Sequence, residues 1–234
     1  MVMNPLTKMA FAGLPKRSGQ IPVAGRAWLL WDEPMTGFDP VTLAFYAREA
    51  PDYAAAGPGG IGRHLDGFLE RLAPGALILE LGCGSGRDAA EMESRGFVVD
   101  PTDGVPEMAA QAAARLGRDV PVMRFDELDA KATYDGVVAA YSLLHVPRVG
   151  LVGVLARIWQ ALKPGGWHVA TYKTAGGEGR DRLGRYYNYL SVAELRACYD
   201  EAGTWSVIET ETAEGRGYEG EMSRFISILL QKAG

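Results

Sequence analysis

The stretch that decides the fold lies in the first half of the chain and reads Ile78-Leu79-Glu80-Leu81-Gly82-Cys83-Gly84-Ser85-Gly86-Arg87-Asp88. It starts with a short apolar run, continues with three glycines two positions apart, and leads into a helix-compatible segment, residues 87–95. This pattern predicts a strand, a tight turn and a helix, with backbone N–H groups at the mouth of a sheet. Glycines there let a ligand approach without a Cβ in the way. The stretch therefore predicts a ligand-binding turn, with Glu80 at the strand end as an additional acceptor.

Glycine turns of this kind also occur in dinucleotide-binding proteins, whose pattern is G-x-G-x-x-G. If Gly82 and Gly84 are the first two glycines of that pattern, the third falls on Arg87. The spacing therefore argues against a dinucleotide site and against an NAD-dependent dehydrogenase. An ordinary strand-to-helix turn without a ligand stays open as an alternative.

The pattern E-x-G-x-G-x-G over residues 80–86 resembles motif I of the class I S-adenosylmethionine-dependent methyltransferases. Two further elements, Ser142-Leu143-Leu144-His145-Val146-Pro147 and Gly184-Arg185-Tyr186-Tyr187, resemble a bacterial subgroup of small methyltransferases. The resemblance covers about residues 41–232. It implies S-adenosylmethionine as cofactor, held at the turn by Glu80, Gly82, Cys83, Gly84, Gly86 and Arg87.

Composition narrows the class of protein further. The chain has 234 residues, a formal net charge of −5 and only two cysteines, Cys83 and Cys198. The acidic balance argues against nucleic acid as the main partner, and the cysteine content fits a reducing cytoplasm rather than a disulfide framework. No apolar run approaches the ~20 residues needed to span a bilayer, so we expect no membrane association. The three histidines do not cluster, and no metal site is predicted.

Alternating strand and helix patterns predict an α/β fold of the doubly wound type, a three-layer sandwich around a seven-stranded, mostly parallel sheet. Strands are expected at residues 76–81, 97–99, 120–125, 134–141, 167–172, 205–211 and 222–231. The resemblance implies the strand order 3-2-1-4-5-7-6, and the last two strands suggest one antiparallel edge strand. Helices are expected at residues 40–50, 61–72, 87–95, 106–116, 149–162 and 191–202.

One domain is expected after a proline-rich beginning. We expect a loosely ordered extension over residues 1–34 and a single methyltransferase domain over 35–234, divided into N-terminal helices that form a lid (35–75) and a cofactor-binding core (76–234) with an insert at 173–190.

In a doubly wound sheet, ligands bind at the carboxyl ends of the strands, so acidic residues just past strands are candidates. Asp103 follows the second strand and is placed to accept two hydrogen bonds from a ribose diol; Asp100 is the competing candidate. Asp126 follows the third strand and corresponds to the family's acceptor for the adenine amine, with Glu127 and Asp129 as competitors.

The end of the fourth strand faces the methyl group in this family. Tyr141 is expected beside the sulfonium, and His145 is the best candidate for a general base, with a structural histidine as the alternative. Upstream, the resemblance implies that Tyr46 and Tyr53 lie on a segment that closes over the cofactor, hinged at residues 57–60.

The insert after the fifth strand is rich in arginine and tyrosine. Lys173, Arg185 and Tyr186 are the candidates there for binding an anionic or planar substrate, and a packed, solvated insert is the alternative. The expected function is methyl transfer to an O, N or S atom of a small molecule. A tRNA methyltransferase of the wobble-uridine type and a non-catalytic S-adenosylmethionine-binding protein stay as alternatives, and the oligomeric state is open.

Overall fold

The computed structural model describes residues 37–56, 63–218 and 220–234. The extension expected at residues 1–34 and the hinge expected at 57–60 lie outside the described residues. The glycine stretch folds as predicted: its apolar run is β1 (Leu77–Leu81), a turn follows, and α3 (Arg87–Ser94) comes next. All side chains of β1 except the first are buried, as expected for a parallel strand covered on both faces.

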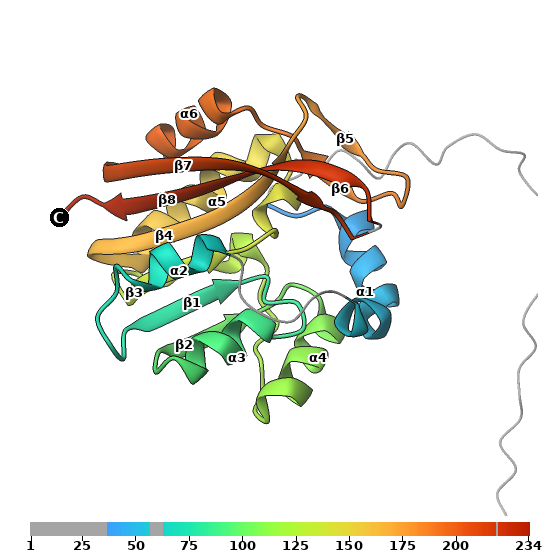
Figure 1. Cartoon of the computed structure of the whole chain (residues 1–234), viewed down its shortest axis with the longest axis horizontal. Helices are drawn as coiled ribbons and strands as arrows, with labels where there is room; N and C mark the ends of the chain where they lie inside the picture. The colour runs from blue at the N-terminus through green and yellow to red at the C-terminus, as the bar shows by residue number, and fades with distance from the viewer. Residues whose placement is uncertain (1–36, 57–62, 219) are drawn as a thin grey trace, which may run out of the picture. The chain divides into compact units, whose positions relative to one another are not determined.

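The main sheet has the strand order β2-β1-β3-β4-β8-β7 (Figure 1). Its remaining strands are β2 (Val98–Thr102), β3 (Tyr134–Ala139), β4 (Leu162–Thr174), β7 (Trp205–Arg216) and β8 (Met222–Lys232). The pairs β1–β2, β1–β3 and β3–β4 are parallel, whereas β8 is antiparallel to both β4 and β7. The sheet is therefore mixed and mostly parallel.

The prediction of a seventh strand at residues 120–125 is wrong for the described chain. That segment makes only one isolated bridge, between Asp103 and Val122. Pro121 stands in the middle of it and has no N–H to donate, which prevents a continuous ladder. The observed order is the predicted order without its third strand.

The antiparallel strand was also misplaced. A short turn joins β7 to β8, and two strands so joined must be antiparallel. Because β8 also pairs with β4, the antiparallel strand lies inside the sheet and β7 forms the edge.

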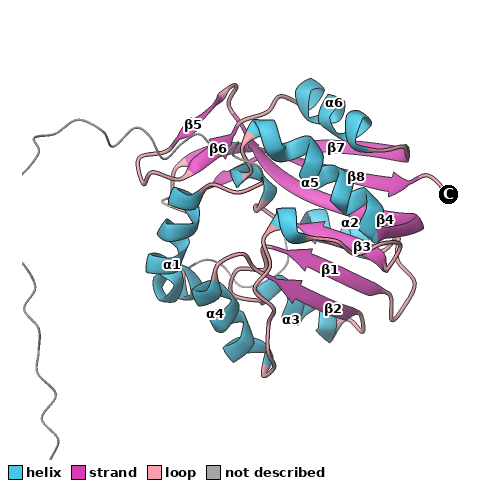
Figure 2. Ribbon diagram, turned by 180° about the vertical axis from the view of Figure 1, so that it is seen from behind, coloured by secondary structure: helices cyan, strands magenta, loops and turns pink. Residues whose placement is uncertain are grey.

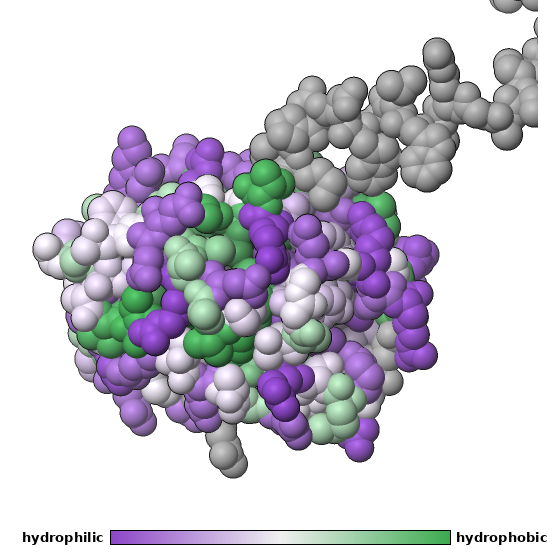
Figure 3. All heavy atoms as spheres, turned by 90° about the horizontal axis from the view of Figure 1, so that it is seen from above, coloured by the Kyte–Doolittle hydropathy of each residue, from purple (hydrophilic) through white to green (hydrophobic). Residues whose placement is uncertain are grey.

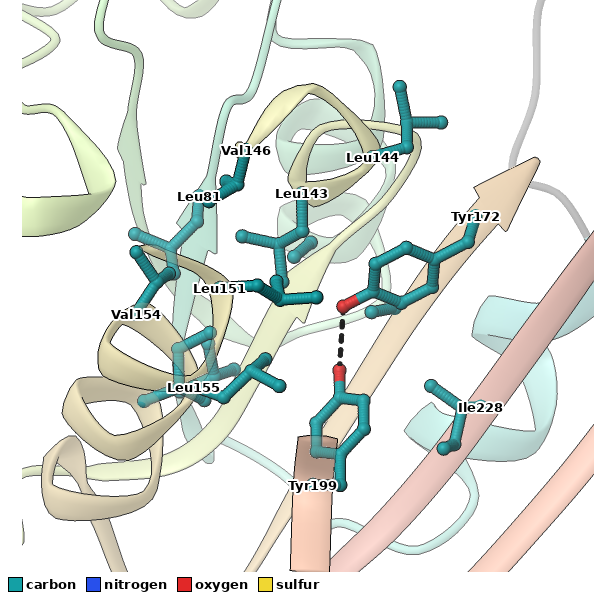
Figure 4. Close-up of a cluster of buried hydrophobic side chains, with 14 of the residues drawn as sticks. Leu81, Leu143, Leu144, Val146, Leu151, Val154, Leu155, Tyr172, Tyr199 and Ile228 are labelled. Atoms are coloured by element: carbon teal, nitrogen blue, oxygen red, sulfur yellow. Dashed lines mark hydrogen bonds between the residues drawn. The ribbon is translucent and has the colours of Figure 1, made fainter. Parts of the chain in front are cut away.

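Helices cover both faces of the sheet (Figure 2). On one face, α5 (Arg148–Ala161) and α6 (Val192–Ala202) pack in the larger hydrophobic cluster, part of which is drawn in Figure 4. On the other face, α2 (Arg63–Leu69) and α3 pack in a second cluster. Inside the larger cluster the hydroxyls of Tyr172 and Tyr199 lie 3.0 Å apart and the ring of His168 bonds to Tyr199, so these buried polar groups are satisfied.

Three helix ends match their sequence signals. α4 (Pro106–Leu116) has proline at its first turn and Gly117 as a left-handed C-cap, and Ser191 forms a capping box with Glu194 at the start of α6. The ends of α4 and the start of α6 are therefore specified by residues at those ends themselves.

The first helix is longer than predicted. α1 (Pro40–Ala55) continues through Pro51, where the sequence predicts its end. Tyr46 and Tyr53 consequently lie seven positions apart on one helix, which places them on the same face. The expected loop around Tyr53 is the last part of this helix.

The insert after β4 forms a small two-stranded sheet of β5 (Glu178–Arg180) and β6 (Tyr186–Asn188). On the face drawn in Figure 3, hydrophobic residues gather in a few patches enclosed by hydrophilic ones. Within the described ranges, no helix is long and apolar enough to cross a membrane.

Candidate active site

A pocket of about 670 Å³, counted to its open mouth, lies at the carboxyl ends of the parallel strands. Its walls come from the glycine turn, the segments after β2 and β3, two short 3₁₀ helices, η1 (Phe125–Glu127) and η2 (Leu143–His145), and the helix α1. Figure 1 shows α1 beyond the end of β1 to which its arrowhead points. This is where a doubly wound sheet places its ligand.

Two of the three glycines line the pocket. Gly82 has φ +74°, and a Cβ on it would lie 2.6 Å from Cβ of Ser142. Gly84 has φ +58°, and a Cβ there would meet only Cε of Met108, at 3.7 Å. Gly86 lies away from the lining, where a Cβ would press on Ala112 of α4 at 3.1 Å. Two glycines thus keep the pocket open, and the third permits close packing of helices.

Asp103 is fixed at the rim of the pocket. Its Oδ2 accepts the N–H of Gly84 and its Oδ1 accepts the N–H of Val105, each at 2.9 Å. The residue is 8% exposed, and burial raises the pKa of its carboxyl to about 6, although both backbone hydrogen bonds oppose that rise. Each oxygen keeps a lone pair for a ligand. The competitor, Asp100, is exposed and does not line the pocket.

Glu80 and Cys83 lie behind the glycine turn. Burial raises the pKa of the Glu80 carboxyl well above its usual range, and this carboxyl accepts the N–H of Ala89 in α3. Its Oε2 has no hydrogen-bond partner among the described residues. Cys83 packs with Ala109 and Ala112, and burial raises the pKa of its thiol. Neither side chain lines the pocket, so their direct contact with the cofactor stays a prediction that the placement does not support.

Arg87 also points away from the pocket, toward the end of α1. Its guanidinium donates to the backbone carbonyls of Ala54, at 2.6 Å, and of Ala56. The last turn of α1 contains no basic residue of its own, so Arg87 supplies the cation that a helix C-terminus favours. At the other end, Arg180 of β5 forms two hydrogen bonds to the N-cap residue Asp39, at 2.9 and 2.7 Å. Arg87, directly after the glycine turn, and Arg180 of the insert therefore hold α1 at its two ends.

We expect Arg87→Ala to loosen the end of α1 that carries Tyr53. The loss of two charge-assisted bonds at a helix terminus should cost about 1 kcal/mol and speed amide hydrogen exchange over residues 50–56. Exchange mass spectrometry measures this, with Arg48→Ala as the control, because Arg48 also lies on α1 but contacts the adjacent Glu49 and the Phe45 ring instead of the end of the helix. Unchanged exchange over residues 50–56 in Arg87→Ala would show that Arg87 does not stabilise the end of α1.

His145 and Tyr46 form a hydrogen-bonded pair in the pocket. Nε2 of His145 lies 2.9 Å from the Tyr46 hydroxyl, and Nδ1 lies 2.7 Å from the backbone carbonyl of Tyr186. Because a carbonyl only accepts, Nδ1 carries the proton and Nε2 accepts from Tyr46. Burial lowers the pKa of His145 to about 4, so the ring is neutral at pH 7.

The core fixes this pair in place. Leu143 and Leu144, the first two residues of η2, are buried in the larger hydrophobic cluster (Figure 4). They anchor the turn that presents His145. Burial also raises the pKa of Tyr46 well above its usual value, and Nη1 of Arg185 lies 3.4 Å from its hydroxyl.

Tyr141 lines the pocket in a strained conformation. It has φ +54° directly after β3 and is 45% exposed, and its ring meets Phe225 edge-on at 5.4 Å. A left-handed backbone at a bulky residue costs of order 1–3 kcal/mol and is concentrated at functional sites. Tyr53, the remaining predicted aromatic, also lines the pocket.

Asp126 is near the pocket but not in its lining. Its carboxylate pairs with Arg124 at 3.1 Å, whereas its neighbours Arg124 and Phe125 line the pocket. Its bond to an adenine amine stays a prediction. Phe125 was not predicted as a site residue, although an aromatic residue directly before the acidic loop is the sequence signal of a stacking surface.

The three predicted substrate residues lie outside the lining. Arg185 is 2% exposed and pairs with Asp181 at 2.7 Å. Its guanidinium lies 5.0–6.0 Å from the ring centroids of Phe45, Tyr46, Tyr187 and Tyr218. The Lys173 ammonium binds Glu221 at 2.8 Å. The Tyr186 hydroxyl donates to Glu178, and only its backbone carbonyl reaches His145. This placement gives no support to their binding an acceptor in this pocket.

Comparisons with known proteins agree with this geometry. Residues 78–166 match a family described as a methyltransferase domain. A trans-aconitate 2-methyltransferase of Deinococcus radiodurans is 30% identical over 96 residues, which are 40% of this chain and 36% of that protein. The chain thus matches little more than a third of that relative's length.

Solved structures share the fold. A 1,6-didemethyltoxoflavin-N1-methyltransferase of Burkholderia thailandensis, with its substrate and S-adenosylhomocysteine bound, has a TM-score of 0.65 at 20% identity and covers 83% of this chain and 88% of its own. A phosphoethanolamine N-methyltransferase 2 of Haemonchus contortus, in complex with S-adenosyl-L-methionine, has a TM-score of 0.64 at 18% identity and covers 81% and 57%. The family match and these structures support an S-adenosylmethionine-dependent methyltransferase.

Proposed function

We propose that this chain transfers the methyl group of S-adenosylmethionine to an O, N or S atom of a small molecule. The observation that carries the proposal is the fixed carboxylate of Asp103 beside Gly82 and Gly84 in one pocket. A carboxylate that already accepts two backbone N–H bonds is rigid, and glycines without Cβ atoms leave room for a ligand beside it. The methyltransferase-domain match over residues 78–166 supports the same conclusion.

The residues present fit this cofactor. We assign Asp103 as the acceptor for the hydroxyls of the ribose. The backbone of Gly82 and Gly84 approaches the ligand. Phe125 and Met108 form apolar walls for the adenine ring. When bound, S-adenosylmethionine supplies a methyl group on a positively charged sulfur that is already activated for attack by a nucleophile.

The protein's own task is then to orient the acceptor, exclude water and remove a proton where the acceptor carries one. Tyr46 and His145 are the groups for the last step. A proton taken up by the Tyr46 oxygen is matched by transfer of the hydroxyl proton to Nε2 of His145, which is neutral and accepting. The predicted role of His145 as base is thereby kept, but through Tyr46.

We also propose a reducing compartment, the cytoplasm, as its location. Cys83 is buried and Cys198 half-buried, and neither is in a disulfide. An acidic chain of net charge −5 with a small aromatic pocket favours a small molecule over tRNA as acceptor.

Binding of S-adenosylhomocysteine should depend on the ionisation of Asp103. Since the pKa of its carboxyl is raised to about 6, the carboxylate that accepts from the ribose is present above pH 6 and is lost as the pH falls through that value. Between pH 7 and pH 5 the affinity should fall about tenfold, which isothermal titration calorimetry measures.

The control is Asp103→Asn, which should bind more weakly by ~1–3 kcal/mol at pH 7 and show no such fall. Burial also raises the pKa of Asp88 to about 6, so a pH dependence that persists in Asp103→Asn would assign the titration to that neighbour. No binding of S-adenosylmethionine or S-adenosylhomocysteine to folded protein would overturn the proposed function.

A further inference from the structure

We infer that the acceptor side of the pocket is built for a planar, uncharged aromatic or heteroaromatic molecule. The inference rests on the proposed function, since it concerns the second substrate of the same site. Three observations carry it: the rings that line the pocket, the state of its charges, and the conformation of Tyr141.

The first observation is the number of rings that converge on the pocket. Six aromatic side chains from three separate segments line it: Phe38, Tyr46, Tyr53, Phe125, Tyr141 and His145. Tyr46 and Tyr53 meet edge to face with centroids 5.2 Å apart, which fixes the orientation of both. Flat rings offer a flat ligand stacked or edge-to-face contacts that a branched aliphatic molecule cannot use as well.

The second observation is the charge state of the lining. Among the described lining residues, only Asp103 and Arg124 carry a formal charge at neutral pH. Arg124 already pairs with Asp126 at 3.1 Å and with Glu127 at 2.9 Å, and its guanidinium lies 4.7 Å from the Phe38 ring centroid. An acceptor carboxylate or phosphate would therefore lose its hydration without gaining an unshared cation, which is strongly unfavourable.

The cations that were predicted to bind an anionic or planar substrate do not change this balance. Arg185 lies behind Tyr46 and is neutralised by Asp181, and Lys173 binds Glu221. Neither belongs to the pocket lining.

The third observation is the backbone of Tyr141. A tyrosine held at φ +54° with 45% of its surface exposed is retained at a cost to stability, and it lies just past the end of β3 in the pocket lining. Phe225 supports its ring edge-on from β8. We assign this ring as a stacking surface for the acceptor, and the Tyr46–His145 pair as the polar contact for the acceptor's O–H or N–H group.

The test uses the full chain saturated with S-adenosylhomocysteine and measures binding of three probes by isothermal titration calorimetry. 2-Naphthol is planar and uncharged, 2-naphthoate has the same rings with a carboxylate, and decahydro-2-naphthol has the same hydroxyl on a puckered, non-aromatic frame. 2-Naphthol is expected to bind at least about tenfold more tightly than either relative. Equal or tighter binding of 2-naphthoate or of decahydro-2-naphthol overturns the inference.

A variant pair locates the probe. Tyr141→Asn removes the ring but keeps a residue that tolerates a left-handed backbone, and should weaken 2-naphthol binding about tenfold with S-adenosylhomocysteine affinity unchanged. Tyr189→Ala is the control, because Tyr189 stacks on Tyr187 outside the lining and should change neither affinity. An unchanged 2-naphthol affinity in Tyr141→Asn contradicts the stacking role.

The measurements distinguish failure of the proposed function from failure of the proposed acceptor class. If S-adenosylhomocysteine does not bind, the proposed function fails; if it binds and the probes show no preference for the planar neutral molecule, only the acceptor class fails.

Discussion

Gly82→Ala is expected to destabilise the protein strongly and to weaken S-adenosylmethionine binding at least about tenfold. Two costs combine at this position. A left-handed backbone at alanine costs roughly 1–2 kcal/mol. The new Cβ would also lie 2.6 Å from Cβ of Ser142, and overpacking of this kind costs roughly 1–3 kcal/mol more.

The effect on binding follows from what Ser142 holds. Its hydroxyl donates to the backbone carbonyl of Leu81 at 2.7 Å, so the ends of β1 and β3 are tied together at this point. Relieving the contact with Ser142 therefore shifts the end of β1 and the backbone of Gly82 and Gly84, which is the part of the pocket proposed to approach the cofactor. Urea unfolding measures the free energy of unfolding, and isothermal titration calorimetry measures the affinity for S-adenosylmethionine.

Gly75→Ala is a matched control for backbone strain. Gly75 has φ +75°, almost the value of Gly82, and a Cβ there has nothing within 4 Å. Gly75→Ala should lower the free energy of unfolding only by the roughly 1–2 kcal/mol of a left-handed backbone at alanine, and should leave cofactor affinity unchanged. Equal losses in the two variants, with equal affinities, would show that the close approach to Ser142 does not matter.

The glycine turn was predictable because its chemistry is local. An apolar run, left-handed glycines and a helix-compatible segment specify β1, the turn and α3 without help from distant residues. The same holds for α4 and α6, whose proline, glycine and capping-box signals lie within a few residues of their ends.

The errors in the elements concern two prolines. Pro51 predicts a helix end, but α1 continues past it. Arg87, directly after the glycine turn, donates to the last carbonyls of this helix. The opposite error was made at residues 120–125. Their apolar pattern predicts a strand, but Pro121 interrupts the segment, which makes only one bridge, to Asp103.

The site shows the same division. Asp103, Tyr141 and His145 were placed in the pocket because residues after parallel strands meet at one edge of a sheet. Arg185 and Lys173 were not, because residue type does not tell which partner a cation finds. Asp181 and Glu221 bind them instead.

Tyr46→Phe is expected to lower kcat about 10²-fold for an acceptor that must lose a proton, with little change in cofactor affinity. The substitution keeps the ring and its contact with Tyr53 but removes the hydroxyl through which His145 acts. His145→Ala should have a similar effect, and the double variant should be no worse than either, because the two groups work as one unit.

Tyr53→Phe is the matched control. Tyr53 lies two turns further along the same face of α1, and its hydroxyl has no hydrogen-bond partner among the described residues. It should retain nearly full kcat. A normal rate in Tyr46→Phe would show that the pair is structural, or that the acceptor reacts without deprotonation.

The pH dependence of kcat separates this paired histidine from an exposed one. An exposed imidazole titrates near pH ~6.5, so a rate that needed its neutral form would fall below that pH. Burial lowers the pKa of His145 to about 4, so its neutral, accepting form is present at all pH values above about 4 and is lost only below. We therefore expect His145 to cause no fall in kcat between pH 8 and pH 5. The measurement uses the wild-type protein with saturating cofactor and the tightest-binding acceptor, and any fall in this range should persist in His145→Ala. An inflection near pH 6.5 that this variant abolishes would mean that the histidine is solvated and acts on the acceptor directly.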